Sequence, residues 1–273
     1  MTEQKDRMTE IQEQDKRIEQ NLELIKYRIV VFSGKGGVGK STIAVNLAYS
    51  LLKDSLKVGL LDADITGPNI PQMVGLSGMP EMMDLHQILP QIKDDLRVIS
   101  IAPMIPKDQP VIWRGPLRSG TISQFLADVV WDELDVLVTD LPPGTGDEVL
   151  TVSQKMHPQL AIIVTTPQEV SLIDCRRAVN MAKKLNIPKI AVVENMSGLI
   201  CPHCGVAIDF FGTGGGEQMA KEMDVTFLGR IPMEKQSREC GDNGTPVVLK
   251  YPESQTTNAF LEISRNVLKF LKQ

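Results

Sequence analysis

The segment GKGGVGKST, residues 34–42, has the residue types and spacing of a phosphate-binding loop. Its glycines allow backbone N–H groups to converge on phosphate oxygens. Lys40 is expected to reach the β and γ phosphates, and Ser41 is expected to hold Mg²⁺. A second lysine, Lys35, adds a further cation to the loop. The residues that match the G-x-x-x-x-G-K-[ST] pattern are Gly34, Gly39, Lys40 and Ser41. The pattern therefore predicts a nucleoside triphosphate site.

Three aspartates follow apolar runs that read as strands, Asp62 and Asp64 in LLDADITGPNIP and Asp140 in VLVTDLPPGTGDE. In an open α/β sheet, ligands bind beyond the carboxyl ends of the strands, so these loops should face the phosphates. Asp140 suits Mg²⁺ through water. Asp62 and Asp64 would share a face of an extended chain, where one could support the metal and the other orient the attacking water. Gly144 could bring a backbone N–H near the γ-phosphate. A single aspartate after a strand is often only a turn former, but three in this topology favour function.

Two cysteines, Cys201 and Cys204, form a C-x-x-C pair in the segment CPHCG. The pair brings two thiolates close enough for one metal centre, whereas a structural zinc site or a [4Fe–4S] cluster needs about four ligands. Cys175 and Cys240 stand alone and are interpreted as ordinary small residues. A two-fold dimer would supply two pairs and complete a four-thiolate site.

Three interpretations of this pair stay open on the residues alone. CPxCG by itself favours half of a zinc ribbon, a thioredoxin-like redox pair lacks fold context, and a bridging labile cluster depends on the family of the chain. His203 could be a further ligand, although its neighbours already supply the pair. The glycine-rich segment FFGTGGGEQMA has no Lys-Ser/Thr after its glycines and is interpreted as a mobile support for a metal loop at about residues 199–216.

Seven short β-rich runs recur along the chain, and helical runs such as residues 41–54 and 170–185 lie between them. Several of the β-rich runs are almost continuously apolar, as expected for strands buried on both faces of a parallel sheet. The alternation predicts a doubly wound, mostly parallel α/β domain over residues 27–273. The predicted strands are residues 27–33, 57–62, 96–102, 134–140, 160–166, 189–195 and 225–231.

Both ends of the chain are predicted to be helical. Residues 1–26 form a polar extension in which Met8, Ile11, Ile18, Leu22 and Ile25 have heptad spacing. A dimerising coiled coil and a surface helix docked on its own domain are both compatible with this pattern, and the length favours the second. The apolar face of residues 258–273 suits docking on the domain better than a membrane surface.

The bulk composition excludes several classes of protein. The chain has 273 residues, 42% hydrophobic and 23% charged, which is enough for a sizeable core. A net charge of -5 gives no attraction to nucleic acid or anionic lipid. We see no export signal and no long apolar run, so a cytoplasmic protein without a membrane span is expected, in which close cysteines are more often metal or redox sites than disulfides.

The loop with two lysines resembles the deviant Walker A loop of MinD/ParA-class P-loop ATPases. Together with DADITGPNIP, WRGP, TDLPPGTGDE, ENMSG, CPHCG and FGTGGGEQMA, it resembles the Mrp/ApbC family of ATP-binding iron–sulfur cluster carriers. The likeness extends from about Arg28 to about Pro246. It implies a homodimer in which Lys35 reaches the partner's phosphates, as an arginine finger supplied in trans would. It also implies that Asp64 positions the hydrolytic water and that Asn195 and the segment around Pro232 contact adenine.

The resemblance thus implies ATP, Mg²⁺ and a [4Fe–4S] cluster as cofactors, with Lys35, Lys40 and Asp64 in slow hydrolysis, Ser41 on magnesium, and Cys201 and Cys204 on the cluster. The implied nucleotide contacts are Gly34, Lys35, Gly36, Gly37, Val38, Gly39, Lys40, Ser41, Thr42, Asp62, Asp140, Gly144, Asn195 and Pro232. We expect a carrier that bridges a cluster between two subunits, receives it from an assembly scaffold and passes it to apo-proteins. The alternatives are a MinD/ParA-like positioning switch and a reductase resembling the nitrogenase iron protein.

Overall fold

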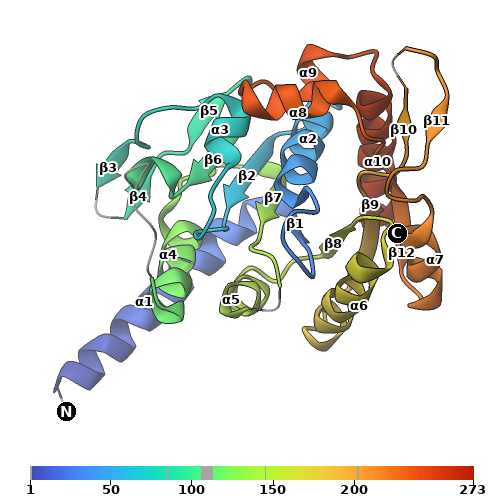
Figure 1. Ribbon diagram of the computed structural model, residues 1–273. Coiled ribbons are helices and arrows are strands. Elements are labelled where there is room, and N and C mark those ends of the chain that lie inside the picture. The colour runs from blue at the N-terminus through green and yellow to red at the C-terminus, as the bar shows by residue number, and fades with distance from the viewer. Residues whose placement is uncertain (1, 85, 106–112, 145, 202) are drawn as a thin grey trace.

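The computed structural model describes residues 2–84, 86–105, 113–144, 146–201 and 203–273. These residues form a central eight-stranded sheet in the order β12-β9-β8-β1-β7-β2-β6-β5 (Figure 1). All neighbouring strands are parallel except the β5–β6 pair. The strands are β1 (Ile25–Phe32), β2 (Val58–Asp62), β5 (Gln91–Lys93), β6 (Leu96–Ser100), β7 (Leu134–Asp140), β8 (Leu160–Thr165), β9 (Lys189–Glu194) and β12 (Thr226–Arg230). The predicted doubly wound fold and all seven predicted strands are confirmed.

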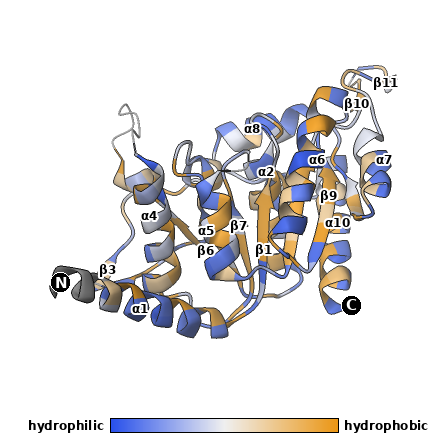
Figure 2. Ribbon diagram, turned by 90° about the horizontal axis from the view of Figure 1, so that it is seen from below, coloured by the Kyte–Doolittle hydropathy of each residue, from blue (hydrophilic) through white to orange (hydrophobic). Residues whose placement is uncertain are grey.

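Two separate hydrophobic cores lie on the two faces of the sheet. Successive side chains of a strand point to opposite faces, so Val30 and Phe32 belong to one core and Ile29 and Val31 to the other. Figure 2 shows the hydrophobic strands between helices whose outer faces are hydrophilic. One core is covered by α1 (Thr2–Glu23), α4 (Gly115–Asp128), α5 (Asp147–Met156), α6 (Glu169–Lys184) and α7 (Gly215–Glu222). The other is covered by α2 (Lys40–Lys53), α3 (Ile70–Val74), α8 (Lys235–Asp242), α9 (Val247–Lys250) and α10 (Gln255–Lys272).

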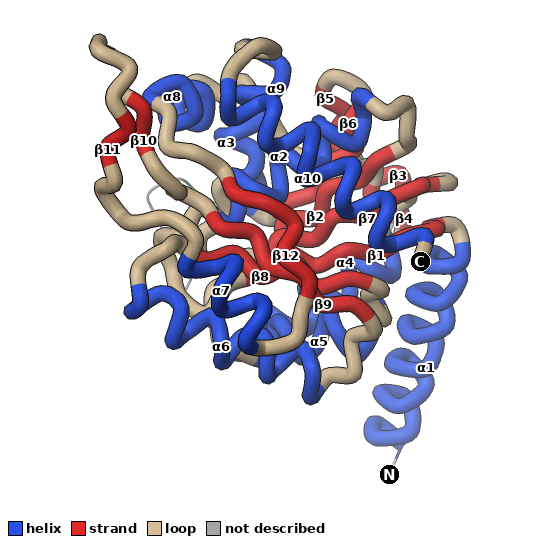
Figure 3. Tube along the Cα trace, turned by 90° about the vertical axis from the view of Figure 1, so that its right-hand side faces the viewer, coloured by secondary structure: helices blue, strands red, loops and turns tan. Residues whose placement is uncertain are grey.

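Two hairpins with very short strands lie outside the main sheet. One pairs β3 (Met82–Asp84) with β4 (Gln87–Ile88), and the other pairs β10 (Leu199–Ile200) with β11 (Ala207–Ile208). The β10–β11 hairpin projects beyond the helical layers in the side view of Figure 3. The hairpin therefore packs little against the hydrophobic cores.

The N-terminal helix docks on its own domain through its C-terminal half. Ile18 and Leu22 are buried, and the Asn21 amide donates to the carbonyl of Ala127 at the end of α4, at 2.7 Å. Met8 and Ile11 remain exposed. The helix therefore uses only the second part of its heptad pattern for packing within the chain.

The C-terminal helix packs with its apolar face in the core, where Phe260 and Val267 are fully buried. Its end lies at the start of β9, because the Lys189 ammonium donates to the carbonyls of Phe270 and Leu271. The chain also enters β1 from α1 at this edge, so both helices adjoin the amino edge of the sheet (Figure 2). None of the helices in the described ranges combines the length and apolar character needed to cross a membrane.

Candidate nucleotide site and cysteine loop

The phosphate loop joins β1 to α2 and is shaped by close approaches at its glycines. Gly39 precedes α2 with φ +84°, a conformation that favours glycine. A Cβ at Gly39 would lie 2.2 Å from Nδ2 of Asn195, which itself donates to the Val38 carbonyl at 2.9 Å. A Cβ at Gly34 would lie 2.1 Å from the carbonyl oxygen of Asp174 in α6. The loop is thus fixed by contacts with two neighbouring segments.

Lys40, Ser41, Asp64 and Asp140 come together at the carboxyl edge of the sheet. The Lys40 ammonium lies 2.9 Å from Oδ1 of Asp140 and 3.3 Å from Oδ2 of Asp64. The Ser41 hydroxyl donates to Oδ2 of Asp140 at 2.6 Å. Burial alone would lower the pKa of Lys40, but the charges of Asp140, Asp64 and Asp62 outweigh it and raise that pKa. The lysine therefore stays a cation among carboxylates.

Asp62 lies behind this cluster and lines neither of the two cavities described below. It is fully buried, and its carboxylate accepts from the Ser100 hydroxyl at 2.8 Å and from the backbone N–H of Asp64 at 3.3 Å. β2 ends at Asp62 and the second bond links the two residues directly, so the extended chain that the sequence argument assumed does not continue to Asp64. Burial and the charge of Asp140 raise the pKa of Asp62 to about 8.

Two adjoining cavities lie beside the phosphate loop. The first, about 580 Å³, is lined by the phosphate loop, Asp64 and Pro143. The second, about 500 Å³, is lined by Asn195, Pro232 and several apolar side chains. Gly39, Thr42, Ser237 and Arg238 line both cavities. The arrangement offers a polar end for phosphates and a more apolar end for a base.

Sequence reasoning missed Ser237 and Arg238 of α8, since neither belongs to a motif.

Gly144 has φ +90° and its N–H donates to the Ser33 carbonyl at 2.8 Å, so this N–H is already engaged. Lys35 is half-buried and stands outside the carboxylate cluster, and its ammonium forms no ion pair within the described residues. Unlike Lys40, that side chain thus has no carboxylate partner in the part of the chain that the structure describes.

The C-x-x-C pair lies on the β10–β11 hairpin. The backbone of Gly205 donates to the carbonyl of Cys201 at 2.9 Å, and that of Cys201 donates to Val206 at 2.9 Å. Cys201 is half-buried and Cys204 is exposed. Hydrogen bonds from the backbone of Cys204 and then of His203 lower the pKa of Cys201. The local geometry thus favours a thiolate, the form in which cysteine binds metals.

The remaining cysteines lie far into the domain. Cys175 is buried in one core and Cys240 in the other. Within the described part of the chain, no three side chains of His, Cys, Asp or Glu gather in a way that could hold a metal ion. The cysteine pair is therefore accompanied by no third candidate ligand among these residues.

Comparison with known proteins identifies the family. A profile described as "ParA: NUBPL iron-transfer P-loop NTPase" matches residues 24–268. The chain belongs to this family. The motif-based resemblance to iron–sulfur carriers of the MinD/ParA class is thereby confirmed at the level of the family.

Relatives within the NUBPL-like family are similar over most of their length. An iron–sulfur cluster carrier protein from Methanocaldococcus jannaschii is 51% identical over 261 residues, which cover 94% of this chain and 89% of the relative. The iron–sulfur cluster transfer protein NUBPL from Dictyostelium discoideum is 43% identical and matches 92% of this chain and 78% of its own.

Solved structures support the same family and fold. A nucleotide-binding protein from Archaeoglobus fulgidus in complex with ADP has a TM-score of 0.77 and 36% identity, covering 90% of this chain and 96% of that one. The cell division ATPase MinD from Pyrococcus furiosus, with a TM-score of 0.67 and 23% identity, covers 90% of this chain and 99% of its own. The second likeness concerns the fold alone.

Proposed function

We propose that this chain is an ATP-hydrolysing iron–sulfur cluster carrier, which holds a [4Fe–4S] cluster between two copies of itself and transfers it to apo-proteins. The names of the relatives support the carrier role. The observation that carries the proposal is the pairing of a phosphate-loop cluster with an exposed C-x-x-C hairpin in one chain.

Each group of the phosphate-loop cluster has a role in this proposal. Lys40 neutralises the β and γ phosphates, and Ser41 and Asp140 hold Mg²⁺ through oxygen atoms, the ligands this ion prefers. Asp64 orients the attacking water, because donors on both sides fix its carboxylate. The donors are the Lys40 ammonium, the Thr66 hydroxyl at 3.0 Å and the Gly67 N–H at 3.3 Å. Lys35, which forms no ion pair with any residue that the structure describes, reaches the phosphates of the partner subunit.

The iron–sulfur cluster is cargo in this proposal, and two chains share it. Cys201 and Cys204 supply two thiolates per chain, whereas a four-iron cluster takes about four. Cys175 and Cys240 are buried in separate cores and too far inside to complete the set. A two-fold axis through the hairpins supplies the other pair. Exposed Ile200, Val206 and Phe210 on the same hairpin would be covered in such a dimer.

The two alternative functions have less support. A lipid-binding positioning switch would need a free apolar face, but that of α10 is buried in the core. A reductase resembling the nitrogenase iron protein would use two well-separated cysteines per subunit, whereas this chain has a close pair.

Anaerobic purification with iron, sulfide and zinc analysis tests the proposal. We expect reconstitution to give about one four-iron cluster per two chains, visible by absorption and transferable to an apo-acceptor. Stoichiometric zinc that resists replacement by iron would overturn the carrier role and leave an ATPase with a structural metal knuckle.

A further inference from the structure

Glu194 is a fully buried carboxylate at the carboxyl end of β9, and within the described residues it forms no ion pair. Its Oε1 accepts from the Ser197 hydroxyl at 2.5 Å and from the Gly214 N–H at 2.9 Å. Its Oε2 accepts from the Gly216 N–H at 2.5 Å. A buried carboxylate is costly unless donors satisfy it, and here three donors do so.

These three donors belong to the two stems of the cysteine loop. Ser197 lies two residues before β10, and Gly214 and Gly216 lie at the start of α7, after the loop returns. A Cβ at Gly216 would lie 3.0 Å from Oε2 of Glu194, so glycine lets the helix end come this close. One carboxylate therefore holds both ends of the segment that carries Cys201 and Cys204.

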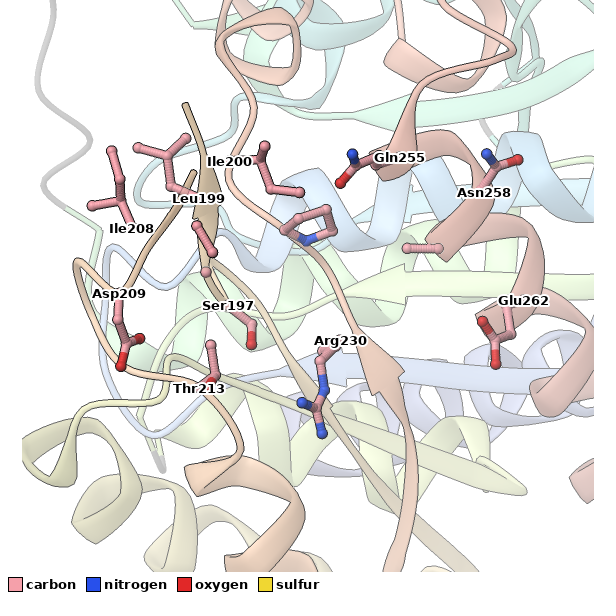
Figure 4. A pocket seen from close by; sticks show the side chains of 14 residues that line it. Ser197, Leu199, Ile200, Ile208, Asp209, Thr213, Arg230, Gln255, Asn258 and Glu262 are labelled. Atoms are coloured by element: carbon pink, nitrogen blue, oxygen red, sulfur yellow. The ribbon is translucent and has the colours of Figure 1, made fainter. Parts of the chain in front are cut away.

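The position of the hairpin depends on these stems because a cavity lies beneath it. This cavity, about 580 Å³, separates β10 and β11 from α10 and β12 (Figure 4). Ser197 and Thr213, one from each stem, line its wall in Figure 4. Ile200 and Ile208 of the hairpin are 46% and 40% exposed, so packing contributes little to its orientation. A small shift at the stems would consequently move the cysteines.

The backbone that follows Glu194 reaches the apolar cavity beside the phosphate loop. The next residue, Asn195, lines that cavity and binds the Val38 carbonyl of the phosphate loop. The backbone N–H of Ile231, just before Pro232, donates to the carbonyl of Glu194 at 2.8 Å, and Ser197 donates back to Ile231 at 3.0 Å. Residues 194–197 thus contact the phosphate loop, the base end of the cavity and both stems.

We propose that Glu194 is a positioning residue that transmits nucleotide binding to the cysteine loop by clamping its two stems. The inference rests on the proposed nucleotide site, but not on the identity of the metal. Nucleotide contacts with Asn195 and Pro232 shift residues 194–197, and the carboxylate passes that shift to Ser197, Gly214 and Gly216. The coupling is carried by short hydrogen bonds within a contiguous network.

The substitution Glu194→Gln tests the clamp with little change of shape. The amide keeps one acceptor oxygen, but its nitrogen faces the N–H of Gly214 or of Gly216, so at least one hydrogen bond to the α7 stem is lost. The negative charge that strengthens the remaining hydrogen bonds is lost as well. The probe is Mg²⁺–ATP on metal-free protein, and the measurement is hydrogen exchange of backbone amides between residues 199 and 216. In wild type we expect ATP to change their exchange rates by at least about fivefold, the low end of measured couplings between sites. In Glu194→Gln the ratio should fall to about one, with ATP affinity unchanged by calorimetry.

Two further variants keep the test decisive. Ser197→Ala removes only one of the three donors, so it should reduce the ATP-dependent change without abolishing it, even if Glu194→Gln does not fold. Asp128→Asn makes the same chemical change at a buried carboxylate that binds Arg17 on the other side of the molecule, and it should leave the change intact.

The outcomes separate this inference from the function on which it rests. Failure of wild type to bind ATP would remove the proposed function. ATP binding with no change of exchange at residues 199–216 would overturn the coupling alone. A full response in folded Glu194→Gln, or one lost equally in Asp128→Asn, would overturn the role of Glu194 as the clamp.

Discussion

The phosphate-loop cluster and the cysteine hairpin are built in opposite ways. Lys40 begins helix α2, Asp64 follows strand β2 and Asp140 ends strand β7, and all three side chains are buried with several partners each. Cys201 and Cys204 lie in the loop that joins two strands of two residues each, and Cys204 is exposed. A reaction that needs fixed geometry is suited to the first arrangement, and the delivery of cargo to another protein is suited to the second. Rigidity and access are thus divided between two parts of one chain.

The largest contrast is expected between cysteine variants in their ability to hold the iron–sulfur cluster. Cys201→Ala or Cys204→Ala should abolish the bridging cluster, because the two-fold axis removes two ligands at once. Cys175→Ala and Cys240→Ala are the matched controls and should retain it, since both thiols lie in the cores. Iron content and visible absorption after anaerobic reconstitution measure the result. A cluster that survives loss of either hairpin cysteine would contradict the four-thiolate assignment.

Alkylation of metal-free protein should distinguish the same thiols by rate. Burial raises the pKa of Cys175 to about 12, whereas backbone hydrogen bonds lower that of Cys201. The thiolate is the reactive form, so iodoacetamide near neutral pH should modify Cys201 at least about a thousandfold faster than Cys175. Peptide mass spectrometry over time gives both rates. Comparable rates would show that the Cys175 region opens readily.

At the phosphate loop, Asp64→Asn should keep ATP binding and lower turnover by at least about a hundredfold. The amide preserves the shape of the side chain but loses the charge that orients water next to Lys40. Steady-state phosphate release, with ATP affinity measured in parallel, checks the prediction. Turnover close to that of wild type would remove Asp64 from this role.

The smallest effect is expected for the affinity of the phosphate loop for ATP. Lys40→Ala should weaken ATP binding by about 2–3 kcal/mol, or roughly 30- to 150-fold, because a buried charged contact disappears and Asp64 and Asp140 lose their cation. Lys35→Ala is the control in the same loop and should leave the affinity of a single chain nearly unchanged. Calorimetry on dilute protein compares them, and equal losses would mean that both lysines contact phosphate within one subunit.

Sequence patterns predicted the sheet well because its buried parallel strands are continuous apolar runs. The short strands β3, β4, β5, β10 and β11 escaped prediction, since two or three residues carry no period. The convergence of Asp64 and Asp140 near Lys40 followed from strand order at the carboxyl edge. The position of Asp62 did not follow from strand order, because it depends on a hydrogen bond that the Asp64 N–H donates to the Asp62 side chain.

Glu194 was overlooked although it carries the same signal as Asp62 and Asp140, an acidic residue that ends an apolar strand. Its partners, Gly214 and Gly216, are about twenty residues away and offer only backbone N–H groups, which any sequence would supply. The sequence can therefore predict that a carboxylate is buried, but it does not predict which groups form hydrogen bonds with it.

The two terminal helices have a practical consequence for measurement. The Lys189 ammonium holds the C-terminal end of α10 at the amino edge of the sheet. The chain passes from α1 into β1 at that same edge. The phosphate loop and the cysteine hairpin both belong to the opposite edge. A surface tether or a fluorescent reporter fused to α1 or α10 would leave the nucleotide cavities and the hairpin facing solution. Single-molecule records of nucleotide arrival and cargo release on one immobilised molecule are accordingly feasible with this architecture.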